Sequence, residues 1–353
     1  MARILIVARS TSSHPGAGGM EKVLDQVAGA LVADQHDLGL VTTSGAASPS
    51  WIANDGLFWT VPGSRPGRYS RTWWREIRRP GQPWSEWRPH LIISEGDAGI
   101  TLARRLPGDP PVVVHVHGTP LDESLTALQE KSLRGLMRFA LNLGVRMPHR
   151  AFHLRRVSAV WAISRRIQRQ LTRFPYLARA YNVEYIPNGI DQRSFAFDER
   201  ERELYRRRLG LTGAGDQLAL TASRLEPEKG IDLALTALSD DRLGSWHIAV
   251  AGEGRALERL KTQSRKLGLD ERAHFVGRLT GGEVAWLMSA ADVFLFPTRR
   301  REGMAMSALE ALASGLPIIG TRSGLEAGPA VDASHVVAAE AASIADAGAT
   351  PAP

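Results

Sequence analysis

Short apolar runs that alternate with stretches of helical spacing are the feature that most constrains this fold. Near-continuous apolar runs predict strands buried on both faces, and helical segments between them predict parallel sheets. After the first run, Leu24, Val27, Ala28 and Leu31 have the i, i+3, i+4, i+7 spacing of a helix with one buried face. We predict strands at residues 3–8, 39–43, 91–94, 112–116 and 159–163, and again at residues 218–221, 247–251, 273–275, 293–296 and 317–320.

The pattern restarts near the middle of the chain, which indicates two domains. A strand end at Tyr185 is followed by an Asn-Gly turn at Asn188, and a charged stretch at 198–208 precedes the second set of strands. The 353 residues suffice for two domains of ordinary size. We therefore expect an α/β protein of two doubly wound, Rossmann-like domains, residues 1–187 and 188–353, which face a cleft. In such sheets ligands bind at the carboxyl ends of the strands.

Composition narrows the class of protein further. The chain has no cysteine, which excludes disulfides and thiolate metal sites and fits a reducing cytoplasm. A net charge of +7 favours an anionic partner such as a phosphate group, a nucleic acid or an acidic membrane face. No uninterrupted apolar run reaches about 18 residues, so we expect a cytoplasmic protein, soluble or peripheral on the inner face of the membrane. The sequence has no nucleic-acid recognition motif, and we expect no nucleic-acid partner.

Three loops that follow predicted strands are candidates for phosphate binding. Gly18 and Gly19 let a ligand approach the backbone at a helix start, although a tight turn explains them equally well. Arg224 and Lys229 are either a diphosphate clamp or two solvated cations. Lys229 lies near a predicted helix start, where a cation is favourable only beside an anion. The third loop is Gly252-Glu-Gly254, in which one residue separates two glycines. A structural turn is the better interpretation of this loop.

Two glutamates flank another predicted helix start. A helix that begins near Met304 places Glu302 just before it and Glu310 nearly two turns inside, about 9 Å along the axis. One ligand lying across this start could meet both carboxylates through sugar hydroxyls, with its phosphates on the helix N–H groups between them. The alternative is an acid favoured by the helix dipole and an ordinary exposed helical glutamate.

Two histidines, His115 and His117, close a strand of the first domain. Imidazoles at a strand end could bind a metal, or one of them could act on a substrate. We find no third ligand at a convincing spacing, so the sequence does not favour a metal site.

The order of these motifs along the chain is more specific than any one of them. Together they resemble the retaining glycosyltransferases of family four, which have the GT-B fold, over roughly residues 3–324. The residues that carry the resemblance are Gly18-Gly19, His117-Gly118, the 187–191 turn, Arg224 with Lys229-Gly230, Gly252-Glu-Gly254, Phe275-Val-Gly277, Glu302 with Glu310, and the 310–320 segment. A nicotinamide dehydrogenase is disfavoured because the first loop lacks the GxGxxG spacing.

The resemblance implies roles for individual residues. Arg224 and Lys229 match positions that neutralise the diphosphate of a nucleoside-diphosphate sugar, and Glu310 matches the ribose-binding glutamate. Glu302 and His117 match residues beside the transferring sugar. The remaining positions matched to the donor site are Gly18, Gly19, Gly252, Gly254, Gly277, Gly303, Met304, Ala305 and Met306.

The resemblance also implies an activity. The second domain would hold the donor, and the first would face the acceptor, a glycan, a lipid-linked saccharide or a small molecule in glycan or cell-envelope polysaccharide biosynthesis. Transfer would retain the anomeric configuration by front-face attack, in which a donor phosphate oxygen takes the acceptor proton. No cofactor or protein-bound metal is implied. The alternatives are a GT-B nucleotide-sugar epimerase or hydrolase, and a non-catalytic nucleotide-sugar-binding protein.

Two further segments carry predictions of their own. Residues 338–353 form a shorter, alanine-rich tail than the family usually has, which we expect to limit domain closure. Because they contain few large apolar groups, their deletion should shift the melting temperature by under about 3 °C. Residues 131–156 and 64–88 each carry seven Lys or Arg residues beside apolar or aromatic ones, including Trp73, Trp74, Trp84 and Trp87. These stretches suit an anionic membrane or, alternatively, a solvated face with tryptophans in the core.

Overall fold

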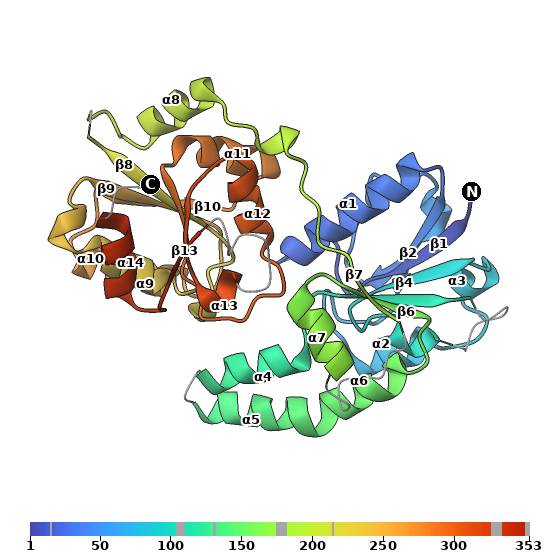
Figure 1. Cartoon of the computed structure of the whole chain (residues 1–353). Coiled ribbons are helices and arrows are strands. Elements are labelled where there is room, and N and C mark those ends of the chain that lie inside the picture. Colours follow the sequence, from blue (N-terminus) through green and yellow to red (C-terminus); the bar gives the residue numbers. More distant parts are fainter. Residues whose placement is uncertain are drawn as a thin grey trace. The chain divides into compact units, whose positions relative to one another are not determined.

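A computed structural model describes residues 1–14, 16–103, 110–129, 132–173, 182–213, 215–325 and 334–349. The chain divides into two compact units, Met1–Asn188 and Gly189–Pro353. Each unit is built on one parallel sheet flanked by helices (Figure 1). The acceptor and donor roles expected for the two units stay predictions.

Unit 1 contains a seven-stranded parallel sheet in the order β3-β2-β1-β4-β5-β6-β7. The five strands predicted in this half are confirmed, whereas the short strand β3 was not predicted. The order reverses between β1 and β4, and such a reversal is where doubly wound sheets bind ligands. The strands are β1 (Arg3–Val7), β2 (Asp37–Thr43), β3 (Phe58–Val61), β4 (Leu91–Glu95), β5 (Val112–Val116), β6 (Ala159–Ala162) and β7 (Val183–Tyr185).

The first helix of unit 1 has the predicted buried face. Leu24 and Ala28 pack with Ile4, Ile6 and Leu40 of the sheet. The spacing of these residues therefore predicts the packing correctly. The helices of this unit are α1 (Gly19–Ala33), α2 (Arg71–Glu76), α3 (Pro83–Glu86), α4 (Pro120–Gln129), α5 (Leu133–Leu141), α6 (Met147–Leu154) and α7 (Arg165–Arg173), with the wider π-helical segment η3 (Asn142–Arg146) between α5 and α6.

Unit 2 contains a six-stranded parallel sheet in the order β10-β9-β8-β11-β12-β13. This is the strand order of the Rossmann fold, and it reverses between β8 and β11. The five strands predicted here are confirmed, and β13 was not predicted. The strands are β8 (Gln217–Ala222), β9 (Trp246–Ala251), β10 (Ala273–Gly277), β11 (Val293–Phe296), β12 (Ile318–Thr321) and β13 (Ser334–Val337).

Two hydrophobic cores cover the two faces of this sheet. Phe294 and Phe296 of β11 contribute to one core, and Val293 and Leu295 contribute to the other. This alternation explains why the strand is an uninterrupted apolar run. The helices that contribute to the first core are α8 (Glu199–Arg208), α11 (Gly281–Ala290), α12 (Met306–Ala313) and α13 (Arg322–Leu325). Those that contribute to the second are α9 (Ile231–Leu238), α10 (Leu257–Lys266) and α14 (Ala341–Ala349).

The tail is part of the second core, which corrects the prediction that little buried area is lost with it. Ile344 and Ala345 of α14 are buried together with Leu235 and Leu238 of α9. Deletion of the tail would therefore remove a buried isoleucine, and replacing a buried isoleucine by alanine costs about 2–5 kcal/mol in general. We therefore expect a larger shift of the melting temperature than the sequence alone predicts, and the shift itself stays a prediction.

The two basic stretches of unit 1 differ in what they expose. Trp73 and Trp84 are buried, and the Trp73 indole donates a hydrogen bond to the Ala98 carbonyl at 3.1 Å. These two tryptophans belong to the core, so the predicted membrane role of the 64–88 stretch is wrong for them. The stretch through α5 and α6 instead exposes several large apolar side chains. Among the described residues, no helix is long and apolar enough to cross a membrane.

Candidate active site

The predicted diphosphate and sugar residues of unit 2 meet where its strand order reverses. Lys229 follows β8, Glu302 follows β11, and the two strands are neighbours in the sheet. The Lys229 ammonium donates to Glu302 Oε1 at 2.7 Å, although the residues are 73 positions apart in the chain. Their side chains are only 15% and 14% exposed. The sequence motifs on the two loops therefore form one site.

Glu302 is surrounded by positive charge. Burial raises the pKa of the Glu302 carboxyl, but the charges of Lys229, Arg300 and Arg224 outweigh burial and hold the pKa below its usual value. Arg300 Nε lies 4.0 Å from Glu302 Oε2, and Arg224 is exposed. One carboxylate does not neutralise three cations. The excess positive charge at the switch point suits an anionic ligand such as a diphosphate.

The loop that carries Glu302 is tied to the loop that carries Lys229. Arg299 donates from both terminal nitrogens to the carboxylate of Asp232 at 2.8 Å, and its backbone N–H donates to the Glu228 carbonyl at 2.8 Å. The backbone N–H of Glu302 donates to the Ser323 carbonyl at 3.1 Å. Bidentate guanidinium–carboxylate pairs fix geometry as well as charge. The positions of Glu302 and Lys229 are therefore set by the fold.

The glycines after β9 bring their loop against the loop after β8. A Cβ at Gly252 would lie 1.9 Å from the Ser223 carbonyl oxygen, and one at Gly254 would lie 2.4 Å from that of Leu225. The Gly252 N–H donates to the Gly277 carbonyl at 2.7 Å. This contact supports the interpretation of a structural turn. The expected contact of these three glycines with a donor stays a prediction.

The α12 helix begins two residues later than predicted. Its first residue is Met306 and its cap is Ala305, whose side chain makes no capping hydrogen bond. Glu310 is therefore only about 6 Å along the axis from the first residue, rather than the predicted distance of about 9 Å. Its side chain is buried, with the residue 3% exposed, which contradicts the alternative of an ordinary exposed glutamate. The segment before the helix holds Gly303, Met304 and Ala305, with Met304 and Met306 buried.

The glycine loop of unit 1 already satisfies one of its backbone donors. Gly18 caps α1, and its N–H donates to Glu21 Oε2 at 2.8 Å. The Ser10 hydroxyl donates to the other oxygen of this carboxylate. Gly19 is the first helical residue, and Pro15 lies outside the described residues. The Glu21 carboxylate therefore already accepts the hydrogen bond that the Gly18 N–H could give to a phosphate. Phosphate binding at this loop stays a prediction.

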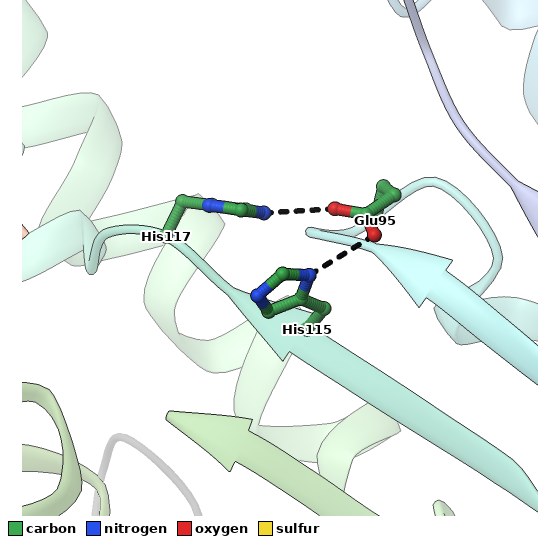
Figure 2. A group of neighbouring side chains, drawn as sticks. All are labelled: Glu95, His115 and His117. Carbon is green, nitrogen blue, oxygen red and sulfur yellow. Dashed lines mark hydrogen bonds and ion pairs between the residues drawn. The ribbon is translucent and has the colours of Figure 1, made fainter. Parts of the chain in front are cut away.

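The two predicted histidines meet a third residue that the sequence did not indicate. Figure 2 shows Glu95 between them: Oε1 lies 3.0 Å from His115 Nδ1, and Oε2 lies 2.8 Å from His117 Nε2. Glu95 ends β4 and stands opposite His115 of β5 in the parallel register. That register is the signal that could have identified Glu95 once the neighbouring strands were known.

Electrostatics favours an ionised Glu95 and a neutral His115. Burial raises the pKa of Glu95, but charge interactions and hydrogen bonds with His115 and His117 outweigh burial and bring the pKa to about 2. Burial lowers the pKa of His115, and Glu95 only partly opposes this effect. The three residues offer ligand atoms within 4.8 Å of one another. The expectation that no third ligand accompanies the histidines is therefore wrong.

Both units match glycosyltransferase families. Residues 18–189 match the family described as Glycosyl transferase 4-like domain, and residues 203–347 match Glycosyl transferases group 1. A GDP-mannose-dependent alpha-(1-6)-phosphatidylinositol monomannoside mannosyltransferase of Mycobacterium tuberculosis is 28% identical over 92% of this chain and 81% of that protein. The enzyme of the same name from Mycolicibacterium smegmatis is 35% identical, but over only 40% of this chain and 39% of that protein.

Solved structures share the fold of the whole chain. Sucrose-phosphate synthase from Thermosynechococcus elongatus superimposes with a TM-score of 0.80 at 18% identity, covering 98% of this chain and 88% of that one. Anabaena Alr3699/HepE in complex with UDP-glucose has a TM-score of 0.69 at 19% identity, with the same coverage of both chains. The fold, the two family matches and the Lys229–Glu302 site agree. The chain belongs to the glycosyltransferases of family four and has their GT-B fold of two Rossmann-like units.

Proposed function

We propose that the protein transfers a sugar from a nucleoside-diphosphate sugar to a glycan or lipid-linked acceptor, with retention of anomeric configuration, in glycan or cell-envelope polysaccharide biosynthesis. The observation that carries this proposal is the Lys229–Glu302 pair, with Arg224 and Arg300 around it, at the switch point of unit 2. Glu302 neutralises one of the three cations, and the two positive charges that remain match the charge of a diphosphate.

Each side chain of this site then has a separate task. The donor diphosphate interacts with Arg224 and Lys229, and the buried Glu310 carboxylate accepts hydrogen bonds from the ribose hydroxyls. Glu302 faces the sugar, where its negative charge stabilises the positive charge that develops as the bond from C1 to the phosphate oxygen breaks. The acceptor oxygen bonds to C1 on the same face, and its proton passes to the departing phosphate oxygen. No cofactor or protein-bound metal takes part in this scheme.

The first donor to test is GDP-mannose. The mycobacterial relatives are named for that donor, and one solved neighbour was crystallised with UDP-glucose, which makes UDP-glucose the natural comparison. Binding of GDP and UDP by calorimetry, with the parent protein and the Lys229→Ala variant, separates the two bases. We expect the preferred nucleotide to bind the parent and to lose affinity in Lys229→Ala. Equal binding to both proteins would contradict the diphosphate role.

Stereochemistry tests the retaining mechanism directly. With an α-linked donor and a phosphatidylinositol mannoside or simple alkyl mannoside as acceptor, nuclear magnetic resonance of the product reports the new anomeric configuration. We expect an α-linkage, because attack and departure take place on the same face of the sugar. A β-linked product would show inversion and overturn the proposed chemistry, and free sugar as the main product would favour a hydrolase.

We also propose that unit 1 binds peripherally to an anionic membrane at the cytoplasmic face. The only buried residue of α5 is Gly135, and Arg134 and Arg138 lie on the exposed surface of the helix. Residues 131–156 contain no acidic residue. Each cation near an anionic leaflet contributes about 1 kcal/mol. The exposed apolar side chains of this surface are Leu133, Leu136, Met137, Leu141, Leu143, Val145 and Phe152.

Sedimentation with liposomes tests this surface. At low salt, we expect the parent to sediment with vesicles of phosphatidylcholine and phosphatidylglycerol. We expect it not to sediment with vesicles that contain only phosphatidylcholine. Met137→Glu should weaken binding because it places a negative charge in the apolar part of the surface. Val32→Glu, at an exposed apolar position of α1, is the matched control and should bind like the parent. Equal sedimentation of the parent with both kinds of vesicle would overturn the proposal.

A further inference from the structure

The contacts of Glu95 fix the positions of two protons. With a pKa of about 2, Glu95 is ionised at neutral pH, and an ionised carboxylate only accepts hydrogen bonds. The nitrogens that face it, His115 Nδ1 and His117 Nε2, must therefore carry the protons. When a ring carries only that one proton, its lone pair is on Nε2 in His115 and on Nδ1 in His117.

His115 is an anchor for this arrangement. Its ring is fully buried, stacks on Trp161 with a centroid distance of 3.9 Å, and has no hydrogen-bond partner at Nε2 within the described part of the chain. A proton moved to Nε2 would become a buried donor without an acceptor, which costs about 1–3 kcal/mol. His115 therefore keeps its proton on Nδ1 and holds Glu95 Oε1 in place.

The same atoms argue against a metal ion between these three side chains. A metal would need the lone pairs of His115 Nδ1 and His117 Nε2, which would force the His115 proton onto Nε2. Histidine ligands nearly always donate their other N–H to a partner, and His115 Nε2 has none among the described residues. The three side chains offer enough ligand atoms for a metal, but His115 Nε2 lacks the hydrogen-bond acceptor that a metal-bound histidine needs within the described part of the chain. Hydrogen bonding to Glu95 satisfies both rings without an ion.

We propose that Glu95 is a positioning residue that holds His117 with its proton on Nε2, so that Nδ1 accepts a hydrogen bond from a hydroxyl of the acceptor. This inference rests on the proposed transfer reaction. The His117 side chain is 15% exposed, in contrast to the buried His115 and Glu95, so it is the member of the group that a substrate can reach. The next residue is also held, because Arg150 donates to the Gly118 carbonyl at 3.1 Å and pairs with Asp97 at 2.9 Å.

The proton position can be read without any substrate. In protein labelled with ¹⁵N-histidine, long-range nitrogen–carbon-bound-proton correlation spectra distinguish a proton on Nε2 from one on Nδ1. We expect His117 in the parent to be protonated on Nε2, and metal analysis of the same sample to find less than a tenth of an equivalent of zinc or iron, on the order of background. A proton on Nδ1, or one metal ion per chain, would overturn the proposal.

Variants test whether this arrangement matters for transfer. In Glu95→Gln, an amide N–H₂ group replaces one carboxylate oxygen and faces an imidazole N–H, so two donors oppose each other. The more exposed His117 should respond by moving its proton from Nε2 to Nδ1. With GDP-mannose as the probe, we expect kcat to fall by about 10- to 100-fold, the range for the loss of a group that orients a histidine, while the donor KM changes little. Glu95→Asp keeps the charge and should recover part of the activity.

A matched control separates positioning from stability. Asp122 is another buried carboxylate of unit 1, and its partners are Thr119, Gln170 and the guanidinium of Arg166 rather than an imidazole. Asp122→Asn should lower stability but leave the His117 proton on Nε2. If Glu95→Gln leaves both the His117 proton and kcat unchanged, Glu95 has only a structural role. Because the proton position is measured without substrate, failure of the sugar-transfer proposal is distinguishable from failure of this one.

Discussion

The two units place a buried carboxylate at equivalent points of similar sheets and surround it with different chemistry. In unit 1, Glu95 ends the strand that follows the reversal of strand order, and two imidazole N–H groups donate hydrogen bonds to it. In unit 2, Glu302 follows the corresponding strand β11, and Lys229 pairs with it. The carboxyl ends of the strands thus carry cations in unit 2 and imidazole rings, which donate hydrogen bonds to Glu95, in unit 1.

The difference indicates what each site can recognise. Ammonium and guanidinium groups attract a diphosphate through their charge, whereas an imidazole with a fixed proton recognises the direction of a hydroxyl. Topology therefore determines where each site lies, and the residues at the strand ends determine what it binds. The following variants test this contrast.

The largest effect should come from Gly252→Ala. Its φ is +132°, and the new Cβ would lie 1.9 Å from the Ser223 carbonyl oxygen, so the loops after β8 and β9 must separate. We expect a loss of roughly 3 kcal/mol or more in the free energy of unfolding, measured by denaturant titration, and loss of nucleotide binding. Gly268→Ala, with φ +67° and nothing within 4 Å of the Cβ, isolates the cost of a positive φ, about 1–2 kcal/mol. Equal losses in the two variants would show that the loop contact is unimportant.

Glu302→Gln should lower turnover on the order of 100-fold without weakening nucleotide binding. A fixed charge that acts mainly in the transition state changes kcat rather than affinity. The ion pair adds a sharper expectation: the variant releases Lys229 from its carboxylate, so the affinity for GDP or UDP should stay equal or rise. Calorimetry beside steady-state rates measures both quantities. A variant that binds nucleotide more weakly than the parent would place Glu302 on the nucleotide instead of the sugar.

Glu310→Ala should have the smallest effect and act on binding. Loss of hydrogen bonds from ribose to a charged group weakens nucleotide affinity by roughly 1.5–3 kcal/mol. The 2′-deoxynucleoside diphosphate provides the control, because it should bind the parent more weakly but distinguish less between parent and variant. Unchanged affinity in Glu310→Ala, together with normal turnover in Glu302→Gln, would leave the pair without a role in the site.

Sequence patterns predict the sheets well because the strands are buried on both faces. The run at 293–296 is apolar throughout, since alternate residues enter opposite cores. The start of α12 was predicted too early because Met304 is apolar and buried like the helix that follows it. Burial of Ile344 depends on packing against α9, which an alanine-rich segment does not reveal.

The unit 1 site was predicted only in part, for a different reason. The histidines are separated by a single residue, but their carboxylate is 20 and 22 positions away and belongs to no motif. Only the parallel register of β4 and β5 brings Glu95 to His115. In the same way, the tryptophans near 64–88 occur among arginines, yet the burial of Trp73 depends on the fold rather than on its neighbours in sequence.

The bonds by which Arg299 joins the loop after β11 to the segment after β8 have a consequence for the entropy of donor binding. Ordering a flexible loop on a ligand costs about 0.5–1.5 kcal/mol for each side chain that loses its freedom. In unit 2 much of that ordering precedes the ligand, because Arg299, Asp232 and the Glu228 carbonyl already hold the two loops together. A nucleotide that enters this unit meets two loops that are already joined. Nucleotide association should therefore be fast and should cost little loop entropy. Removing the Arg299–Asp232 ion pair should slow nucleotide association, because the two loops would then have to be ordered during binding.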